Sequence, residues 1–187
     1  MAGLPAVQMI GARLVVRDYR LADAEAACTA IQESRGSLAR WVPDIARHQT
    51  PAEVRAALQR LATLRLQARG LVFGLWERTS GDFLGEVGLY RVDWARRSGE
   101  VGYWLRQSAR GHGYAAEGLA LLCDQARSGL GLRRLEAHIA ADNLASRRVA
   151  ERQGFQCVGQ RPAVPRWDGA VDRMLIYARL LEPALAA

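Results

Sequence analysis

A glycine-rich hexapeptide near the middle of the chain has the composition of an anion-binding turn. It reads Arg110-Gly111-His112-Gly113-Tyr114-Ala115 and lies between a strand-like segment and a helix-like segment. The first turn of a helix has unpartnered main-chain amides and a partial positive charge, which together bind phosphates. Glycine lets a phosphate approach those amides closely, and an arginine adds charge-assisted hydrogen bonds. The hexapeptide therefore predicts a phosphate-binding loop.

Glycines in such a turn have a second interpretation, in which they serve only the dihedral angles of a tight strand-to-helix connection. Two nucleotide-binding alternatives are excluded. The chain has no Gly-x-x-x-x-Gly-Lys-Ser/Thr segment, and no Gly-x-Gly-x-x-Gly segment with an acidic residue about twenty residues further on. The expected anion is therefore neither a nucleoside triphosphate on a P-loop nor a dinucleotide on a Rossmann turn.

The charge of the chain agrees with a polyanionic ligand. The formal net charge is +7, and all 26 basic residues are arginine, whose planar fork of donors suits phosphates and carboxylates. A small cofactor with several phosphates explains this charge as well as nucleic acid does, and composition alone does not choose between them. The arginines are spread along the chain without forming a tail or block, which counts against nucleic acid.

The composition predicts a single globular domain without a membrane span or a metal site. The 187 residues suit one domain over 1–187, and 50% of them are hydrophobic, enough to form a core. No apolar stretch is long enough to span a bilayer and the first eight residues do not resemble a signal peptide, so a cytoplasmic protein that makes no membrane contact is expected. Cys28, Cys123, Cys157 and the three histidines lack disulfide or ligand spacing, so no metal site is expected.

Hydrophobic periodicity and turn residues predict the elements that position the glycine turn. Strands are expected over 13–18, 71–77, 83–92, 99–106 and 133–140, with a final hairpin of 155–164 and 171–180 around Asp168-Gly169. Helices are expected over 23–34, from Thr50-Pro51-Ala52-Glu53 to Gly70, over 114–128, and from Asp142 or Asn143 to Gly154, with a loop or short helix that Pro43 stops. The expected fold class is α+β, a mixed, mostly antiparallel central sheet flanked by helices.

Several segments, taken in chain order, form a pattern that none of them has alone. They are Arg40-Trp41-Val42-Pro43, Glu100 to Leu105, Arg110-x-x-Gly113-x-Ala115, Asn143-x-x-Ser146 with Gly154-Phe155, and Trp167-Asp168-Gly169 with Asp172 and Tyr177. The pattern resembles the GNAT N-acetyltransferases, and within them the Rim-type branch that acetylates the N-termini of ribosomal proteins. The third segment matches the pyrophosphate loop of that family, and the likeness covers nearly the whole chain.

The resemblance implies a GNAT fold in which the fourth and fifth family strands splay apart and hold the pantetheine arm of acetyl-CoA between them. It implies that the arm pairs with backbone groups from Val101 through Trp104 to Leu105. It places the pyrophosphate on the loop formed by Arg110, Gly111, His112, Gly113, Tyr114 and Ala115, with the His112 side chain exposed. It also implies that Asn143 hydrogen-bonds the pantetheine, that Ser146 lies near the thioester sulfur, and that Trp41 forms a wall of the substrate site. Two alternatives stay open: Ser146 as a helix residue that bonds its cap, and Trp41 as a core residue.

The implied reaction needs few catalytic groups. A thioester is already activated, so a positioned neutral amine attacks it, and the resulting oxyanion needs a donor such as a backbone amide near Gly102. Ser146 is the expected partner of the departing thiolate, and a base must take a proton from the incoming ammonium. Rim-type enzymes commonly carry Glu in a Gly-Phe-x-x-Glu-Gly turn, where this chain has Val158. Glu100, Glu86 or water then takes the role, although Glu100 also fits a strand carboxylate paired with an arginine.

The expected function is therefore an acetyl-CoA-dependent N-acetyltransferase of a primary amine. A protein N-terminal α-amine is the first acceptor, because the branch resemblance points to it. A small-molecule amine, such as an aminoglycoside or polyamine, is the second. A third hypothesis is a non-catalytic protein that binds CoA; the replacement of the usual Glu by Val158 is the only feature of the sequence that indicates it. The chain is expected to act as a monomer or homodimer.

Overall fold

A computed structural model describes residues 4, 6–162, 164–165 and 171–182, and at its centre is an eight-stranded sheet. In spatial order its strands are β1 (Gln8–Ile10), β2 (Leu14–Asp18), β3 (Leu71–Glu77), β4 (Phe83–Asp93), β5 (Ser98–Leu105), β6 (Arg134–Ala140), β10 (Met174–Leu180) and β7 (Gln156–Gln160). All neighbouring pairs in this sheet are antiparallel except β5 and β6, which are parallel. Two short strands, β8 (Val164–Pro165) and β9 (Val171–Asp172), pair with each other.

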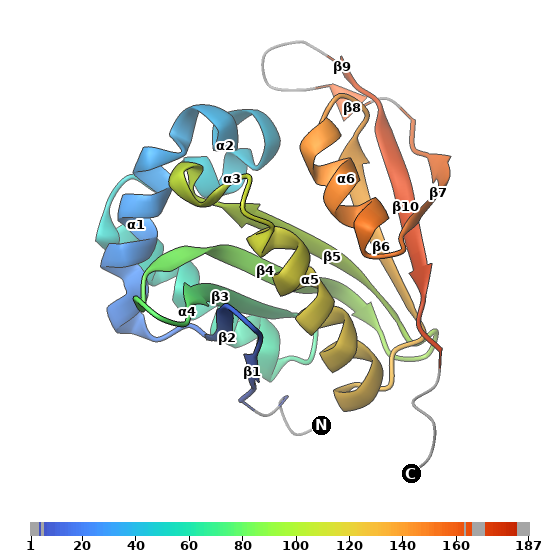
Figure 1. The fold of residues 1–187 in the computed structure, drawn as a ribbon, viewed down its shortest axis with the longest axis horizontal. Helices are drawn as coiled ribbons and strands as arrows, with labels where there is room; N and C mark the ends of the chain where they lie inside the picture. The colour runs from blue at the N-terminus through green and yellow to red at the C-terminus, as the bar shows by residue number, and fades with distance from the viewer. Residues whose placement is uncertain (1–3, 5, 163, 166–170, 183–187) are drawn as a thin grey trace.

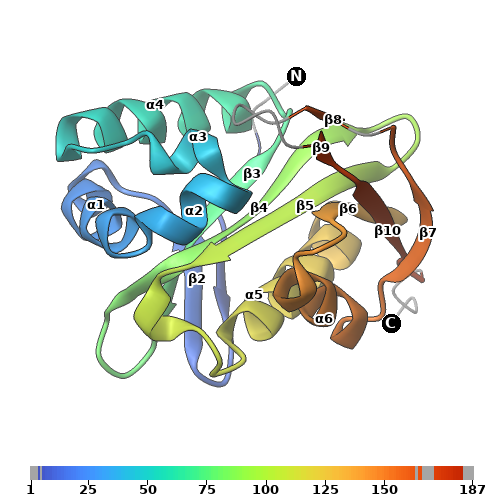
Figure 2. The ribbon, with the colours of Figure 1, turned by 90° about the horizontal axis from the view of Figure 1, so that it is seen from above.

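The helices cover both faces of the sheet. One face carries α1 (Ala24–Glu33), α2 (Arg35–Trp41), α3 (Pro43–Ala46) and α4 (Pro51–Leu66), preceded by the 3-10 turn Leu21–Asp23. The other face carries α5 (Tyr114–Asp124) and α6 (Leu144–Arg152), as Figures 1 and 2 show. No helix in the described ranges has both the length and the apolar composition needed to cross a membrane. The observed layers confirm the expected α+β class.

Each face of the sheet has its own hydrophobic core. Under α5 and α6 the core is built on fully buried residues of the strands and of α5, among them Phe73, Leu89 and Leu119. Under α1 to α4 a second core contains Phe83, whose ring packs edge-on against Trp76 and Trp104 at centroid distances of 5.1 and 5.9 Å. Because both faces are covered, the central strands are held rigidly, and side chains near their ends can be positioned accurately.

Local sequence signals explain most element boundaries. The Thr50 hydroxyl accepts the Glu53 amide at 3.3 Å and the Glu53 carboxylate accepts the Thr50 amide at 3.0 Å, which is the expected capping box of α4. The short helix stopped by Pro43 is confirmed as α2, which ends at Trp41 because the residue before a proline disfavours the helical conformation. Pro43 itself then begins α3, where its missing N–H costs nothing. One expectation needs correction. The helix expected over 114–128 changes at Gln125 into a π-helical turn, which keeps Ala126 buried.

The parallel strands β5 and β6 diverge after a short pairing. Their register pairs Ser98 with Arg134, Gly99 with Leu135 and Glu100 with Glu136, and no further pairs follow. Beyond this point β6 pairs only with β10, while β5 pairs only with β4, so a gap opens between β5 and β6 toward α2 and α6 (Figure 1). The expected splay is confirmed.

The C-terminal hairpin is confirmed as a pairing of β7 with β10 and of β8 with β9. Its expected turn at Asp168-Gly169, together with Trp167, lies outside the described residues. The backbone of Asp172 belongs to β9, and Tyr177 lies in β10 with its ring buried.

Candidate active site

The gap between β5 and β6 presents free backbone groups of β5. The Arg106 amide donates to the Leu84 carbonyl and the Arg133 amide donates to the Arg97 carbonyl. Because strand residues alternate in the side to which their backbone groups point, even-numbered residues of β5 face β4 and odd-numbered ones face the gap. The amide expected near Gly102 is therefore that of Tyr103, since the Gly102 amide points to β4 and the Val101 amide is used by the pairing of Glu100 with Glu136.

The glycine turn before α5 is shaped to receive an anion. Gly111 and Gly113 both have φ of +83°, a left-handed conformation that favours glycine, and a Cβ on Gly111 meets no atom within 4 Å. Within the described part of the chain, the main-chain amides from Gly111 to Ala115 have no hydrogen-bond partner. Free amides at a helix N-terminus beside open space are the arrangement that binds a phosphate.

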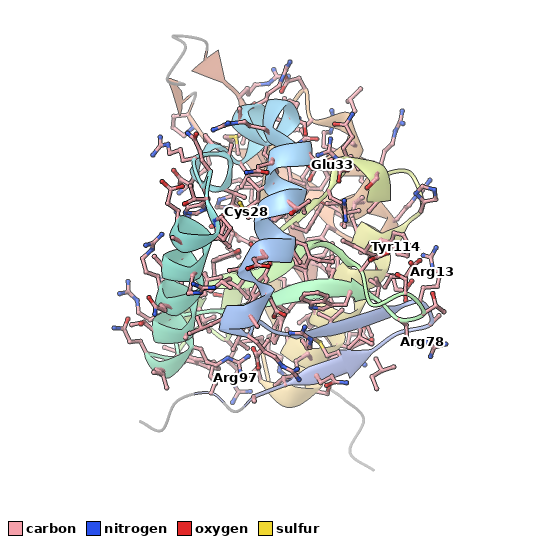
Figure 3. All side chains as sticks on the ribbon, turned by 90° about the vertical axis from the view of Figure 1, so that its left-hand side faces the viewer. Arg13, Cys28, Glu33, Arg78, Arg97 and Tyr114 are labelled. Carbon is pink, nitrogen blue, oxygen red and sulfur yellow. The ribbon has the colours of Figure 1, made fainter. Side chains whose placement is uncertain are left out.

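Arg13 on the segment before β2 braces this turn. Its Nη1 donates to the His112 carbonyl at 2.7 Å, and its guanidinium lies over the Tyr114 ring at 4.7 Å (Figure 3). Glu117 accepts the Arg13 amide at 2.7 Å and the Arg13 Nε at 2.9 Å. The Tyr114 hydroxyl donates to Glu77 at 2.6 Å, while the His112 side chain is exposed. These contacts give Tyr114 and Glu117 a structural role; the ligand contact expected of Tyr114 stays a prediction.

Arg110 has its guanidinium turned away from the free amides. Its Nη2 donates to the Leu105 carbonyl at 3.0 Å and to the Ser37 hydroxyl at 2.7 Å. It therefore ties the end of β5 to α2. Its Nε also donates to the Leu105 carbonyl at 3.2 Å, so both acceptor positions of this carbonyl, which faces the gap, are used. A contact between Arg110 and a phosphate stays a prediction.

Asn143 and Ser146 begin α6 on the far side of the gap. The Asn143 side chain accepts the Ser146 amide at 3.2 Å, so it is the N-cap expected from the sequence. The Ser146 hydroxyl donates to the Tyr103 hydroxyl at 3.0 Å. Nothing in the sequence distinguishes Tyr103 from the other aromatic residues in strands. Its odd-numbered position on β5, which turns its backbone groups toward the gap, is the one signal that could have identified it. Burial raises the pKa of Tyr103 to about 12, so its hydroxyl stays protonated at neutral pH.

The opposite face of the sheet carries a charged cluster at the point where β5 and β6 diverge. Glu100 pairs with Arg91 at 2.7 Å and lies 3.4 Å from the Nδ1 of His138 on β6. The Nε2 of His138 lies 3.4 Å from Glu136. The ion pair with Arg91 agrees with the interpretation of Glu100 as a paired strand carboxylate. The sequence did not single out His138, because it has no neighbour at metal-ligand spacing.

Glu86 on β4 lies on this same face and is buried. It accepts the Tyr19 hydroxyl at 3.0 Å and the Tyr90 hydroxyl at 3.3 Å. Burial raises its pKa to about 7, and the two tyrosine hydroxyls offset part of that rise by bonding the charged form. Glu86 thus has the acidity of a proton acceptor at neutral pH, but it is enclosed by tyrosines.

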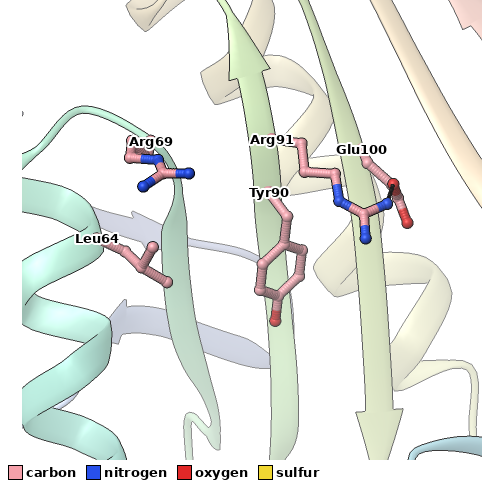
Figure 4. A pocket seen from close by; sticks show the side chains of 5 residues that line it. All are labelled: Leu64, Arg69, Tyr90, Arg91 and Glu100. Atoms are coloured by element: carbon pink, nitrogen blue, oxygen red, sulfur yellow. Dashed lines mark hydrogen bonds and ion pairs between the residues drawn. The ribbon is translucent and has the colours of Figure 1, made fainter.

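A recess of about 290 Å³ opens next to Glu100 and Tyr90 on the α4 side. Figure 4 shows Leu64 and Arg69 on one side of it and Arg91 reaching toward Glu100 on the other. Arg91 has φ of +48° at an irregularity of β4, a conformation that is uncommon for a residue with a side chain. In this conformation its guanidinium reaches the face that carries Glu100. The recess therefore contains two guanidinium groups and one carboxylate.

Trp41 lies at the end of α2, half-buried, above the mouth of the gap. The guanidinium of Arg40 lies 4.5 Å from its ring centroid and forms an ion pair with Asp142, which immediately precedes the N-cap of α6. This ion pair between two exposed side chains links the end of α2 to the start of α6. Trp41 as a substrate wall remains a prediction.

Val158 and the cysteines contribute no titratable group to the gap. Val158 is 55% exposed on β7. Cys28 and Cys123 are buried, and Cys157 is exposed. Among the described residues, no group of three or more His, Cys, Asp and Glu side chains is arranged to hold a metal ion.

Comparison with known proteins shows a family for the part of the chain that contains β5, β6 and the glycine turn. The profile described as "Acetyltransferase (GNAT) domain" matches residues 13–156, from the start of β2 to the start of β7. The ribosomal-protein-serine acetyltransferase of Escherichia coli (strain K12) is 28% identical over 135 residues, 72% of this chain and 74% of that protein. The uncharacterized N-acetyltransferase YoaA of Bacillus subtilis (strain 168) is 30% identical over 102 residues. That match spans 54% of this chain and 58% of YoaA, less than two thirds of its length.

The solved structures include a close match in fold. RimL, a ribosomal L7/L12 alpha-N-protein acetyltransferase in complex with coenzyme A, has a TM-score of 0.83 at 18% identity. The match covers 94% of this chain and 98% of RimL. The arrangement of sheet, gap and helices is therefore the one seen in RimL.

Proposed function

Because the chain belongs to the GNAT acetyltransferases, we propose that it transfers the acetyl group of acetyl-CoA to the N-terminal α-amine of a protein. Family membership makes it an acetyltransferase with acetyl-CoA as donor, as expected from the sequence. The observation that carries the proposal is the gap between β5 and β6, which ends at the free amides of the glycine turn. The acceptor and the roles of individual residues are the proposed part.

The donor is proposed to bind along the gap. Its pyrophosphate accepts hydrogen bonds from the amides between Gly111 and Ala115, and its pantetheine arm pairs with the odd-numbered backbone groups of β5. The residues present fit such a ligand, since those amides are free and a Cβ at Gly111 would stand in open space. The Asn143 side chain, at the opposite side of the gap, is the proposed partner of the pantetheine amides.

The charge of the recess beside Glu100 supports an acceptor that is not polycationic. Arg69 and Arg91 outnumber Glu100 there, and Glu100 is already paired with Arg91. Aminoglycosides and polyamines carry several ammonium groups, which two guanidinium groups repel. A peptide N-terminus brings a single ammonium. Among the curated relatives, the Escherichia coli protein is named for a ribosomal-protein serine, which also supports a protein acceptor.

The chemistry proposed for this site is direct attack of the amine on the thioester. The Tyr103 amide stabilises the oxyanion that forms on the acetyl carbonyl. The Tyr103 and Ser146 hydroxyls, 3.0 Å apart, supply a hydrogen bond and a proton to the departing thiolate. Most of the acceleration comes from holding the amine and the thioester together.

An acceptor screen tests the proposal. Peptides with a free N-terminal Ser or Ala are compared with the same peptides that are Nα-acetylated but contain an internal lysine, and with spermidine and an aminoglycoside. Thiol release and the mass of the acceptor are both measured. The Cys157→Ser variant is used, because the exposed Cys157 thiol reacts with thiol reagents. The enzyme itself contains no lysine, so acetyl-lysine found in the assay comes from the acceptor.

The expected result is acetylation of free peptide N-termini and little transfer to internal lysines or polyamines. Preferential acetylation of spermidine or the aminoglycoside would show that the acceptor is a small-molecule amine and not a protein N-terminus. Absence of transfer to every acceptor, with CoA bound, would favour the non-catalytic alternative.

A further inference from the structure

His138 lies on β6 just beyond the last residue that pairs with β5. The register of the parallel pair advances evenly from Ser98–Arg134 to Glu100–Glu136. Continued by two residues, it brings His138 level with Gly102, in the part of β5 where the pantetheine arm is proposed to end. His138, Glu136 and Glu100 all project to the sheet face that carries the recess, because strand side chains alternate between faces.

The surroundings of the imidazole define its hydrogen-bonding pattern. Nε2 lies 3.4 Å from the Glu136 carboxylate, which only accepts, so Nε2 carries the proton. Nδ1 lies 3.4 Å from Arg161 Nη1, which only donates, so Nδ1 has its lone pair free in the neutral ring. The same Nδ1 lies 3.4 Å from the Glu100 carboxylate. Nδ1 therefore has a partner in both states: Arg161 when the ring is neutral and Glu100 when it is protonated.

Each of the two carboxylates beside His138 is also paired with an arginine. Arg91 pairs with Glu100 at 2.7 Å, and Arg134 pairs with Glu136 at 2.8 Å. Burial acts to raise the pKa of Glu136, but the contacts with Arg134 and His138 lower it more, so this pKa lies below its ordinary value. Glu136 thus stays ionised and holds the Nε2–H tautomer. The His138 side chain is 13% exposed, so it is largely shielded from water but still reachable.

We propose that His138 is the proton acceptor for the incoming amine, a role that Val158 cannot fill and that Glu100 supports. The inference rests on the proposed function. Nδ1 takes one proton from the acceptor ammonium, and the freed lone pair forms the bond to the acetyl carbon. As the C–S bond breaks, the new amide nitrogen loses its second proton and the thiolate gains one. His138 returns its proton to solvent, so each turnover releases one proton overall. Glu136 and Glu100 are positioning residues.

The test compares His138→Gln with the wild type and with His48→Gln as a matched histidine control. His48 lies before α4 beside Arg60 and takes no part in the gap. With a free peptide N-terminus as acceptor, His138→Gln is expected to lower kcat by about 10²- to 10⁴-fold, the usual contribution of a general base. The acid limb of the pH–rate profile should disappear, and the thermal stabilisation by CoA should be retained. His138→Ala should regain part of its rate in added imidazole.

Glu100→Gln supplies a second measurement that needs no change at His138. Loss of the carboxylate removes the partner of protonated Nδ1, so the acid limb should move to lower pH while CoA stabilisation stays unchanged. If the His138 variants do not fold, an acid limb that is displaced while most of kcat is kept supports His138 as the base, whereas loss of the limb together with kcat would make Glu100 itself the base and overturn the proposal.

Three outcomes separate the hypotheses. An active wild type with an unchanged rate and pH profile in His138→Gln overturns the role of His138 and leaves the proposed function standing. If His138→Gln does not fold, an acid limb that stays in place in Glu100→Gln overturns the role. A wild type that binds CoA but acetylates no amine overturns the proposed function and this inference together.

Discussion

Tyr103 on β5 and Ser146 on α6 hold the two sides of the gap together through their hydroxyl groups. The Tyr103 hydroxyl donates to the Ser146 carbonyl at 2.8 Å, and the Ser146 hydroxyl donates to the Tyr103 oxygen at 3.0 Å. Both groups come from elements whose positions are set by the core under α5 and α6. A protonated pair of hydroxyls thus spans the gap on the face opposite to His138.

Ser146→Ala is expected to reduce turnover with little effect on CoA affinity. A partner of the thiolate acts mainly as charge develops on sulfur, so its loss raises the barrier and not the ground-state binding energy. A hydrogen bond to a charged group contributes about 1.5–3 kcal/mol, which corresponds to a 10- to 100-fold lower kcat. Steady-state kinetics with a good acceptor and calorimetric CoA binding measure the two effects.

Asn143→Ala, at the same end of α6, is expected to affect CoA binding where Ser146→Ala affects turnover. It removes the N-cap of α6 and the proposed pantetheine contact, so it should weaken CoA binding and lower the unfolding free energy by about 1 kcal/mol. If Ser146→Ala leaves kcat unchanged, Ser146 is only a helix residue that bonds its cap.

Gly113→Glu should abolish the thermal stabilisation that CoA gives to the wild type. A carboxylate at this position repels the pyrophosphate and blocks access to the amides, and stabilisation by a ligand depends on its binding to the folded state. Gly131→Glu is a matched control, because Gly131 also has a positive φ, of +66°, with no atom within 4 Å of a Cβ. Gly131 lies beyond the other end of α5. Both variants should melt lower, but Gly131→Glu should keep the full CoA shift. The absence of any shift in the wild type at millimolar CoA would refute the loop assignment.

Glu86→Gln should remove a pH dependence of stability. The pKa of Glu86 is raised to about 7 by burial, so the folded state binds its proton more tightly than the unfolded state does. The stability this contributes is complete below the unfolded pKa and is lost as pH rises through the folded pKa. The wild type should therefore lose up to about 3 kcal/mol relative to Glu86→Gln between about pH 5 and pH 8. Urea denaturation of both proteins across this range measures the difference; parallel curves would contradict the prediction.

Thr50→Ala tests the capping box of α4, the helix whose Leu64 lines the recess. Loss of the cap should lower the unfolding free energy by about 1 kcal/mol, and kcat should not change because the recess itself is intact. Chemical denaturation and steady-state rates provide the comparison. A large loss of rate at unchanged stability would mean that the start of α4 contacts the acceptor directly.

Local patterns in the sequence determined most of the helices and strands and the glycine turn before α5. Thr50 and Glu53 cap α4 through hydrogen bonds between residues only three positions apart. The glycines of the turn before α5 act through their own backbone angles. Both features can therefore be inferred from residue types and spacing. The alternation of apolar residues determined the faces of the strands in the same way. These features depend on contacts close in sequence, and they agree with the structure.

The contacts between the groups proposed for proton transfer were decided only by the tertiary structure. Glu100 and His138 are separated by 38 positions, and they meet because β5 and β6 pair in parallel for three residues before they diverge. Tyr103 and Ser146 meet for the same reason on the other face. The register of a parallel pair is set by packing of the whole sheet and not by any local pattern, so no spacing in the sequence could reveal these contacts.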